Sequence, residues 1–244
     1  MINRRNFLLT GTTASVATGL SAGSSNAATP SRLRSGKVIL FQGDSITDAH
    51  RDKKTQVANN LRGLGLGYPA HIAGGLLRDE AELGLQIHNR GISGHKVPDL
   101  DARWETDAID IEPGILSILV GVNDIWHKLN GRYDGTPEVY RDGLEALLDR
   151  TRLALPETTL VICEPFVLKC GAVDETWFPE FETRRAYAEE VAAKAGAIWV
   201  PFQKMFNNAV AAGTAPEYWA ADGVHPTVAG HALMAQTWRE TVGV

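Results

Sequence analysis

The sequence Lys37-Val-Ile-Leu-Phe-Gln-Gly-Asp-Ser45 joins a short apolar, partly β-branched run to a glycine, an acid and a serine. Apolar runs of this length that stop at Gly or Pro are typical of buried parallel strands. Gly43 permits a tight turn after the run, because glycine adopts backbone angles that are closed to other residues. A serine at such a turn is either a nucleophile facing a pocket or simply the N-cap of the next helix. The segment alone leaves both interpretations of Ser45 open.

Four more apolar runs of similar length follow along the chain, at 85–89, 115–120, 159–163 and 197–200. Longer amphipathic segments with helical spacing lie between or after them, at Tyr68–Glu82, Pro98–Ile109, Pro137–Leu155, Phe178–Lys194 and Pro226–Val242. This alternation predicts a doubly wound α/β/α sandwich around a parallel sheet of five strands. Ligands of such sheets bind beyond the carboxyl ends of the strands, so functional residues are expected directly after the apolar runs.

The first thirty residues differ in composition from the rest of the chain. Asn3-Arg4-Arg5-Asn6-Phe7-Leu8 resembles a twin-arginine export motif, and Ser25-Asn26-Ala27 matches the small-residue pattern of a cleavage site. The alternative is an ordinary amphipathic N-terminal helix. The order of the regions favours an exported protein, located in the periplasm or outside the cell. We therefore expect a twin-arginine-type signal peptide at 1–27, a short linker at 28–36 and one folded domain at 37–244.

The overall composition is that of a globular protein: of 244 residues, 44% are hydrophobic and 22% are charged. The formal net charge of -5 argues against a nucleic-acid or anionic-membrane partner, because both favour a basic face. No segment after the leader reaches the length of a membrane span, so we expect a soluble mature protein. Cys163 and Cys170 are too few for a disulfide scaffold. Export would permit a bond between them, but we expect free thiols.

Three further polar motifs occur at the ends of apolar runs or before the last helical segment: Asn89-Arg-Gly-Ile-Ser-Gly94, Gly121-Val-Asn-Asp124 and Asp222-Gly-Val-His-Pro226. A base that takes a proton from serine needs its second ring nitrogen held by a carboxylate, and Asp222 precedes His225 by three residues. The Asn123 amide and the Gly94 N–H can donate to a developing oxyanion. Each motif alone is equally compatible with a turn or a loop.

Taken in order, these motifs and Gly43-Asp44-Ser45 resemble those of the SGNH (GDSL-type) hydrolase family. The resemblance covers 37–244. It implies a flavodoxin-like three-layer α/β/α sandwich, in agreement with the alternation of strands and helices. It also implies a serine esterase that works through an acyl-enzyme.

The resemblance assigns a role to one residue of each motif. It implies that Ser45 is the nucleophile and that Asp222 and His225 complete a catalytic triad. It implies further that Ser45, Gly94 and Asn123 form the oxyanion hole.

A narrower resemblance, to the bacterial acetylxylan-esterase branch of the family, rests on the strings Gly43–Asp48, Leu64–Tyr68, Asn89–Gly94, Asp99–Trp104 and Gly121–Trp126. Such enzymes remove acetyl groups from plant-wall polysaccharides or their oligosaccharides, so the expected substrate is an acetylated carbohydrate or another small ester. Two alternatives stay open: a lipolytic enzyme (lysophospholipase or thioesterase type) with the same triad, and a non-catalytic carbohydrate-binding module. Trp126 is either a sugar-stacking residue or a core aromatic, whereas Trp104 is expected in the core.

We expect no metal site and no cofactor. The remaining histidines lack metal-ligand spacing such as His-Glu-x-x-His, and the pair Asp48-Ala-His50 is too small for a site. The implied acyl transfer needs neither. Asp44 and Asp124 are expected to hydrogen-bond their own loops rather than to take part in catalysis.

Overall fold

The structure is a computed structural model that describes residues 33–34 and 37–244. The predicted signal peptide at 1–27 lies outside the described residues, as does most of the linker at 28–36, so both stay predictions. The described residues belong to one compact unit.

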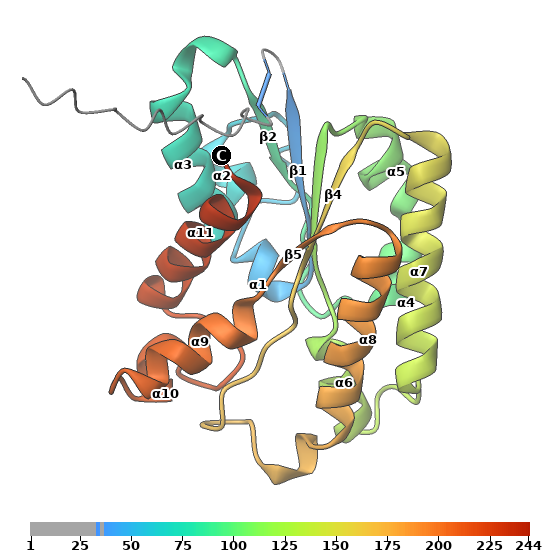
Figure 1. The fold of residues 1–244 in the computed structure, drawn as a ribbon, viewed down its shortest axis with the longest axis vertical. Helices are drawn as coiled ribbons and strands as arrows, with labels where there is room; N and C mark the ends of the chain where they lie inside the picture. Colours follow the sequence, from blue (N-terminus) through green and yellow to red (C-terminus); the bar gives the residue numbers. More distant parts are fainter. Residues whose placement is uncertain (1–32, 35–36) are drawn as a thin grey trace, which may run out of the picture. The chain divides into compact units, whose positions relative to one another are not determined.

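The centre of this unit is a sheet of five parallel strands in the order β2-β1-β3-β4-β5 (Figure 1). Each strand falls on one of the predicted apolar runs, which confirms the α/β fold class. The strands are β1 Val38–Gly43, β2 Gln86–Asn89, β3 Ile115–Leu119, β4 Thr159–Cys163 and β5 Ile198–Val200.

Helices cover both faces of the sheet and make it the middle of three layers (Figure 1). One face carries α3 (Tyr68–Asp79), α9 (Phe202–Ala211) and α11 (Val228–Val242). The other carries α4 (Val97–Asp101), α5 (Trp104–Asp107), α7 (Pro137–Ala154) and α8 (Glu180–Lys194). Shorter helices and turns complete the unit: α1 (Ser45–Asp48), α2 (Leu61–Leu64), η1 (Ala81–Leu83), η2 (Ile109–Ile111), α6 (Val122–Leu129), η3 (Glu175–Trp177) and α10 (Pro216–Trp219).

The alternation of side chains along β1 divides the core into two clusters. Ile39 and Phe41 pack on the α3 and α11 side, where the Phe41 ring lies 5.3 Å from that of Trp238. Leu40 points to the opposite face and packs in one cluster with residues of α7, including Leu147. Because β1 is buried on both faces, it is apolar at every one of these positions, as central parallel strands are.

The helix predicted at Pro98–Ile109 is wrong in detail, because the segment breaks into α4, α5 and η2. The break falls at Arg103, whose side chain is only 12% exposed. Its guanidinium donates to the Gln42 Oε1 and to the Arg90 carbonyl, both at 2.9 Å. These tertiary bonds override the helical spacing. The helices α6 and α9 were not predicted, the first because its start was interpreted as a turn.

The expectations for Trp104 and for the two cysteines are confirmed. Trp104 is 1% exposed and its indole N–H donates to the Thr151 hydroxyl at 3.0 Å. Cys163 and Cys170 are both buried and form no disulfide. Within the part of the chain that the structure describes, no helix is both long and apolar enough to span a bilayer.

Leu147 and Leu153 on α7 form a matched pair for testing this packing. Leu147 is fully buried, whereas Leu153 is 87% exposed on the same helix. Leu147→Ala should lower the free energy of unfolding by about 2–5 kcal/mol, because it removes buried contacts and leaves a cavity. Leu153→Ala should change it by less than about 0.5 kcal/mol. Urea denaturation of both variants measures the difference, and equal effects would contradict the assigned orientation of α7.

Candidate active site

The carboxyl ends of β1, β2 and β3 bring three of the sequence motifs to one edge of the sheet. α1 begins at Ser45 directly after β1, and the Asp44 carboxylate caps it by accepting from the Ile46 N–H at 3.0 Å. Gly43 has no room for a side chain, because a Cβ there would lie 2.2 Å from the Leu119 carbonyl oxygen of β3. The glycine therefore lets the chain turn against the neighbouring strand and present Ser45 at this edge.

Ser45, His225 and Asp222 form a continuous hydrogen-bonded chain. The Ser45 Oγ lies 2.8 Å from the His225 Nε2, and the His225 Nδ1 lies 2.7 Å from the Asp222 Oδ2. The other carboxylate oxygen, Oδ1, accepts from the backbone N–H groups of Val224 and His225 at 2.9 and 2.7 Å. Sequence reasoning placed these three residues correctly beside one another.

The bonds to Asp222 fix its charge and the orientation of the histidine. Partial burial raises the pKa of Asp222, but the hydrogen bonds from the His225 ring and from two backbone amides outweigh it and hold the pKa below its usual value. The ionised carboxylate keeps the ring hydrogen on Nδ1. The Nε2 is then free to accept the hydroxyl hydrogen of Ser45, which is the arrangement that activates a serine.

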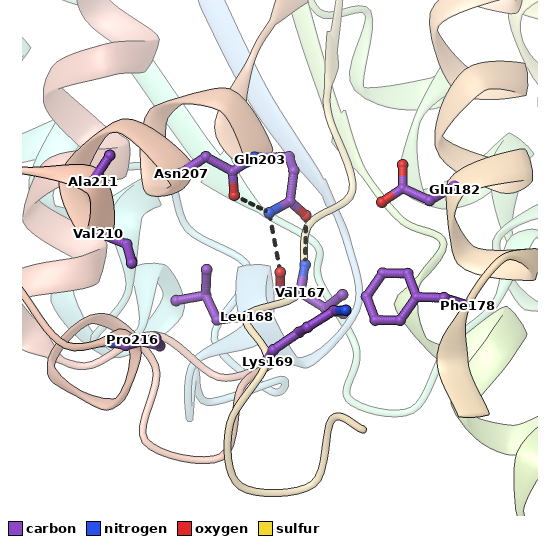
Figure 2. Close-up of a pocket in the computed structure, with 10 residues that line it drawn as sticks. All are labelled: Val167, Leu168, Lys169, Phe178, Glu182, Gln203, Asn207, Val210, Ala211 and Pro216. Carbon is purple, nitrogen blue, oxygen red and sulfur yellow. Dashed lines mark hydrogen bonds between the residues drawn. The ribbon is translucent and has the colours of Figure 1, made fainter. Parts of the chain in front are cut away.

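The segment 168–173 supports Asp222 from behind. The Leu168 N–H donates to the Gly223 carbonyl at 2.8 Å, and the Ala172 N–H donates to the Asp222 carbonyl at 2.9 Å. A cavity of about 420 Å³ lies beside this segment, and Figure 2 shows Leu168 and Lys169 among its lining residues. The cavity contains none of the site residues predicted from the sequence.

Asn123 and Gly94 meet through the loop after β2. Asn123 stands at the start of α6, is 4% exposed, and donates one amide hydrogen to the His95 carbonyl at 3.2 Å. Its second amide hydrogen stays available. Gly94 has a φ of +83°, which favours glycine, and its backbone N–H makes no hydrogen bond within the described residues. Both predicted oxyanion donors thus lie on adjoining segments of the same edge.

Asp48 anchors the loop that carries Gly94, a role that sequence reasoning missed. Its Oδ2 accepts from the Ser93 N–H at 2.9 Å and from the Ser93 hydroxyl at 2.7 Å, and it also pairs with Lys53 at 2.7 Å. Burial raises the pKa of Asp48, but the bonds from Lys53 and Ser93 lower it below its usual value overall. The only signal in the sequence was an acid in the first helix, which does not reveal a partner 45 residues away.

A cavity of about 510 Å³ opens beside Ser45 and His225. Its wall is largely aliphatic, with a few polar side chains: Ile46, Ala49, His50, Leu66, Ser93, Pro226, Val228 and His231. Substrate in this cavity would have direct access to the serine hydroxyl.

Trp126 lies next to the catalytic chain rather than wholly in the core. Its ring centroid is 5.8 Å from that of His225 and 5.6 Å from that of Trp177. It is half-buried and packs against the core cluster of the α3 and α11 side. The structure therefore agrees with the core interpretation in part, because one side of the ring packs inward, and the sugar-stacking role stays a prediction.

The expectations for the two neighbouring acids fare differently. Asp44 does bond its own loop, through Ile46. The expectation for Asp124 is wrong, because the residue is fully buried and neither of its carboxylate oxygens makes a hydrogen bond of normal geometry, although the nearby Val97 backbone N–H partly offsets the rise in its pKa that burial causes. It sits in the first turn of a helix that was interpreted as a loop. Burial raises the pKa of Asp124 to about 6 and that of Asp44 to about 7.

Among the described residues, no group of three or more His, Cys, Asp or Glu side chains is arranged to hold a metal ion.

Fold and site together define the class of SGNH-type hydrolases: a three-layer α/β/α sandwich with a serine after the first strand and Asp-x-x-His before the last helix. The chain belongs to the GDSL-like lipase/acylhydrolase family, whose model matches residues 41–233. A similar curated protein is the acetylxylan esterase of Geobacillus stearothermophilus. It is 33% identical over 217 residues, which cover 87% of this chain and 96% of that protein.

Solved structures agree with this assignment. A GDSL-like protein from Parabacteroides merdae ATCC 43184 is 45% identical with a TM-score of 0.84, over 86% of this chain and 97% of that one. Axe2, an acetylxylan esterase from Geobacillus stearothermophilus, is 31% identical with a TM-score of 0.78, over 87% and 97%. The chain is therefore a carboxylic ester hydrolase of the SGNH type, and the resemblance to the acetylxylan-esterase branch is confirmed.

The burial of Asp44 predicts a pH-dependent stability. The unfolded carboxyl ionises near 3.8 and the folded one near 7, so folding takes up a proton between these values and stability falls as pH rises through them. Above pH 7 the cost is about 4 kcal/mol. Asp44→Asn keeps an acceptor for the Ile46 N–H but cannot ionise. It should be more stable than the wild type at pH 8, with a difference that vanishes near pH 4. Urea denaturation at pH 4, 6 and 8 tests this, and a pH-independent difference contradicts it.

Proposed function

We propose that this protein is a serine esterase that removes acetyl groups from plant-type polysaccharides or their oligosaccharides. The observation that carries the proposal is the hydrogen-bonded chain from Ser45 through His225 to Asp222. The sugar substrate is supported by the similarity to an acetylxylan esterase. Further support comes from two structural neighbours, which are catalytic mutants of Axe2 with a serine or a histidine changed to alanine.

The first half of the reaction transfers the acetyl group to the enzyme. His225 Nε2 takes the hydroxyl proton as Ser45 Oγ attacks the ester carbonyl carbon, and the Asp222 carboxylate stabilises the imidazolium that forms. His225 then gives this proton to the leaving sugar oxygen. The products are the free sugar hydroxyl and an acetyl ester on Ser45.

The second half repeats these steps with water. His225 takes a proton from the water, whose oxygen attacks the acetyl carbonyl, and then returns a proton to the Ser45 oxygen as acetate leaves. In both halves, negative charge develops on the carbonyl oxygen. The Ser45 N–H, the Gly94 N–H and the free amide hydrogen of Asn123 are the donors that hold it. Asp48 acts through Ser93 to position the Gly94 loop.

Trp126 borders His225 and offers an aromatic surface to a sugar ring of the leaving group.

A lipolytic activity is the second candidate, and the observation that favours it is the largely aliphatic wall of the cavity beside Ser45. A non-catalytic carbohydrate-binding module would have no use for a serine held 2.8 Å from a histidine that is itself paired with a carboxylate.

Ser45→Ala tests the proposal directly. The variant should fold normally and lose acetate release by a factor on the order of 10⁴ to 10⁶, because the only proposed nucleophile is gone. Acetate release is measured from acetylated xylan oligosaccharides. Hydrolysis rates are measured in parallel on acetate, butyrate, octanoate and palmitate esters. Acetyl esters should be cleaved best. Near-wild-type turnover in Ser45→Ala would refute the triad. Preference of the wild type for octanoate or longer, without release from acetylated sugars, would favour the lipolytic candidate instead.

Asn123→Ala separates transition-state stabilisation from substrate binding. An oxyanion donor acts mainly when charge develops, so kcat should fall by roughly 10²- to 10³-fold with little change in KM. Steady-state kinetics with an acetylated oligosaccharide gives both constants, and thermal unfolding controls for the lost bond to the His95 carbonyl. A pure KM effect would make Asn123 a substrate-positioning residue.

A further inference from the structure

His231 is a buried histidine that the proposed mechanism leaves unused. It lies in the first turns of α11, is 9% exposed, and lines the same cavity as Ser45 and His225. His231 is therefore part of the wall of the cavity beside Ser45.

One hydrogen bond fixes the tautomer of this ring. The His231 Nδ1 accepts from the Tyr68 backbone N–H at 3.1 Å. Burial lowers the pKa of His231 to about 4, and the nearby His71 and His225 add to the effect, so the ring is neutral at the pH of ester hydrolysis. A neutral ring whose Nδ1 accepts must carry its hydrogen on Nε2. Among the described residues, the ring has no hydrogen bond besides that from Tyr68.

The other polar side chains of the wall outside the triad are less suited to donate. The Ser93 hydroxyl already gives its hydrogen to Asp48 at 2.7 Å. His50 is exposed, and no side-chain hydrogen bond among the described residues holds its ring in one tautomer. His231 is thus the pre-oriented donor of the cavity.

We propose that the Nε2–H of His231 donates a hydrogen bond to an oxygen of the acylated sugar ring bound in this cavity. The inference rests on the proposed function and names a substrate-binding residue for it. A cavity of about 510 Å³ is far larger than an acetyl group requires, so it has room for part of the sugar.

Although most of the wall is aliphatic, the donor at His231 favours this ligand over a fatty acyl chain. A donor facing a largely aliphatic cavity loses water when a ligand enters, and this costs free energy unless the ligand supplies an acceptor. A sugar ring has hydroxyl, ring and ester oxygens together with apolar C–H faces that suit Ile46, Leu66 and Val228. An alkyl chain has only the apolar part.

Two substitutions separate the donor from the structural role of the ring. His231→Asn keeps an acceptor near the position of Nδ1, for the Tyr68 N–H, and removes the donor at Nε2. His231→Gln does the reverse, because its longer side chain carries an amide N–H toward the position of Nε2. The readout is the ratio of kcat/KM for acetylated xylotriose to kcat/KM for phenyl acetate, which lacks sugar oxygens, together with thermal unfolding of each variant.

The donor role predicts opposite behaviour of the two variants. In His231→Asn the ratio should fall roughly threefold to tenfold, chiefly through KM for the sugar, with the melting temperature close to that of the wild type. In His231→Gln the ratio should stay within about twofold of the wild type even where the melting temperature falls.

Two results would overturn the inference and leave the proposed function intact, provided that the wild type deacetylates acetylated xylotriose. The first is an unchanged ratio of the two kcat/KM values in His231→Asn. The second is an equal loss of kcat/KM on both substrates in both variants. A wild-type enzyme that cleaves phenyl acetate through Ser45 but releases no acetate from acetylated xylotriose would instead overturn the proposed substrate, and this inference with it.

Discussion

The parallel pairing of β1 with both β2 and β3 is the constraint on which the rest of the site depends. Because neighbouring parallel strands end at the same edge, the loops that follow them are forced together. The pairing also brings the Leu119 carbonyl so close to Gly43 that only glycine fits there. The chain consequently leaves the sheet after β1 at one fixed place, and Ser45 lies within reach of the two loops that carry Gly94 and Asn123.

The residues of the proposed site were largely predictable from the sequence, because each stands in a short motif at the end of an apolar run or before the last helical segment. Ser45, Asp222 and His225 lie where their motifs placed them, within hydrogen-bonding distance. The supporting residues were not predictable. Asp48 is hydrogen-bonded to Ser93, 45 positions away, and His231 to Tyr68, 163 positions away. Only the folded structure reveals such pairings. The helix predicted from periodicity at Pro98–Ile109 failed for a similar reason, because hydrogen bonds from Arg103 to residues distant in the sequence interrupt it.

Two features beside His225 bear on the choice of substrate. A cavity whose wall is largely aliphatic, with a few polar side chains, opens beside Ser45 and His225, and the ring of Trp126 lies 5.8 Å from that of His225. An acylated oligosaccharide is amphipathic in the same sense, since its rings have apolar faces and oxygen-bearing edges. These surroundings, rather than the hydrogen-bonded chain itself, bear on whether the proposed substrate is a sugar ester or a lipid ester.

The bond between Ser45 and His225 joins residues that are 180 positions apart. Ser45 belongs to the first strand-turn-helix unit, whereas Asp222 and His225 directly precede α11. During synthesis, the ribosome must therefore add all the residues between Ser45 and His225 before the proposed triad can assemble. A nascent or truncated chain that stops short of His225 carries a serine without its proposed base, so the proposed activity cannot arise before that point in synthesis.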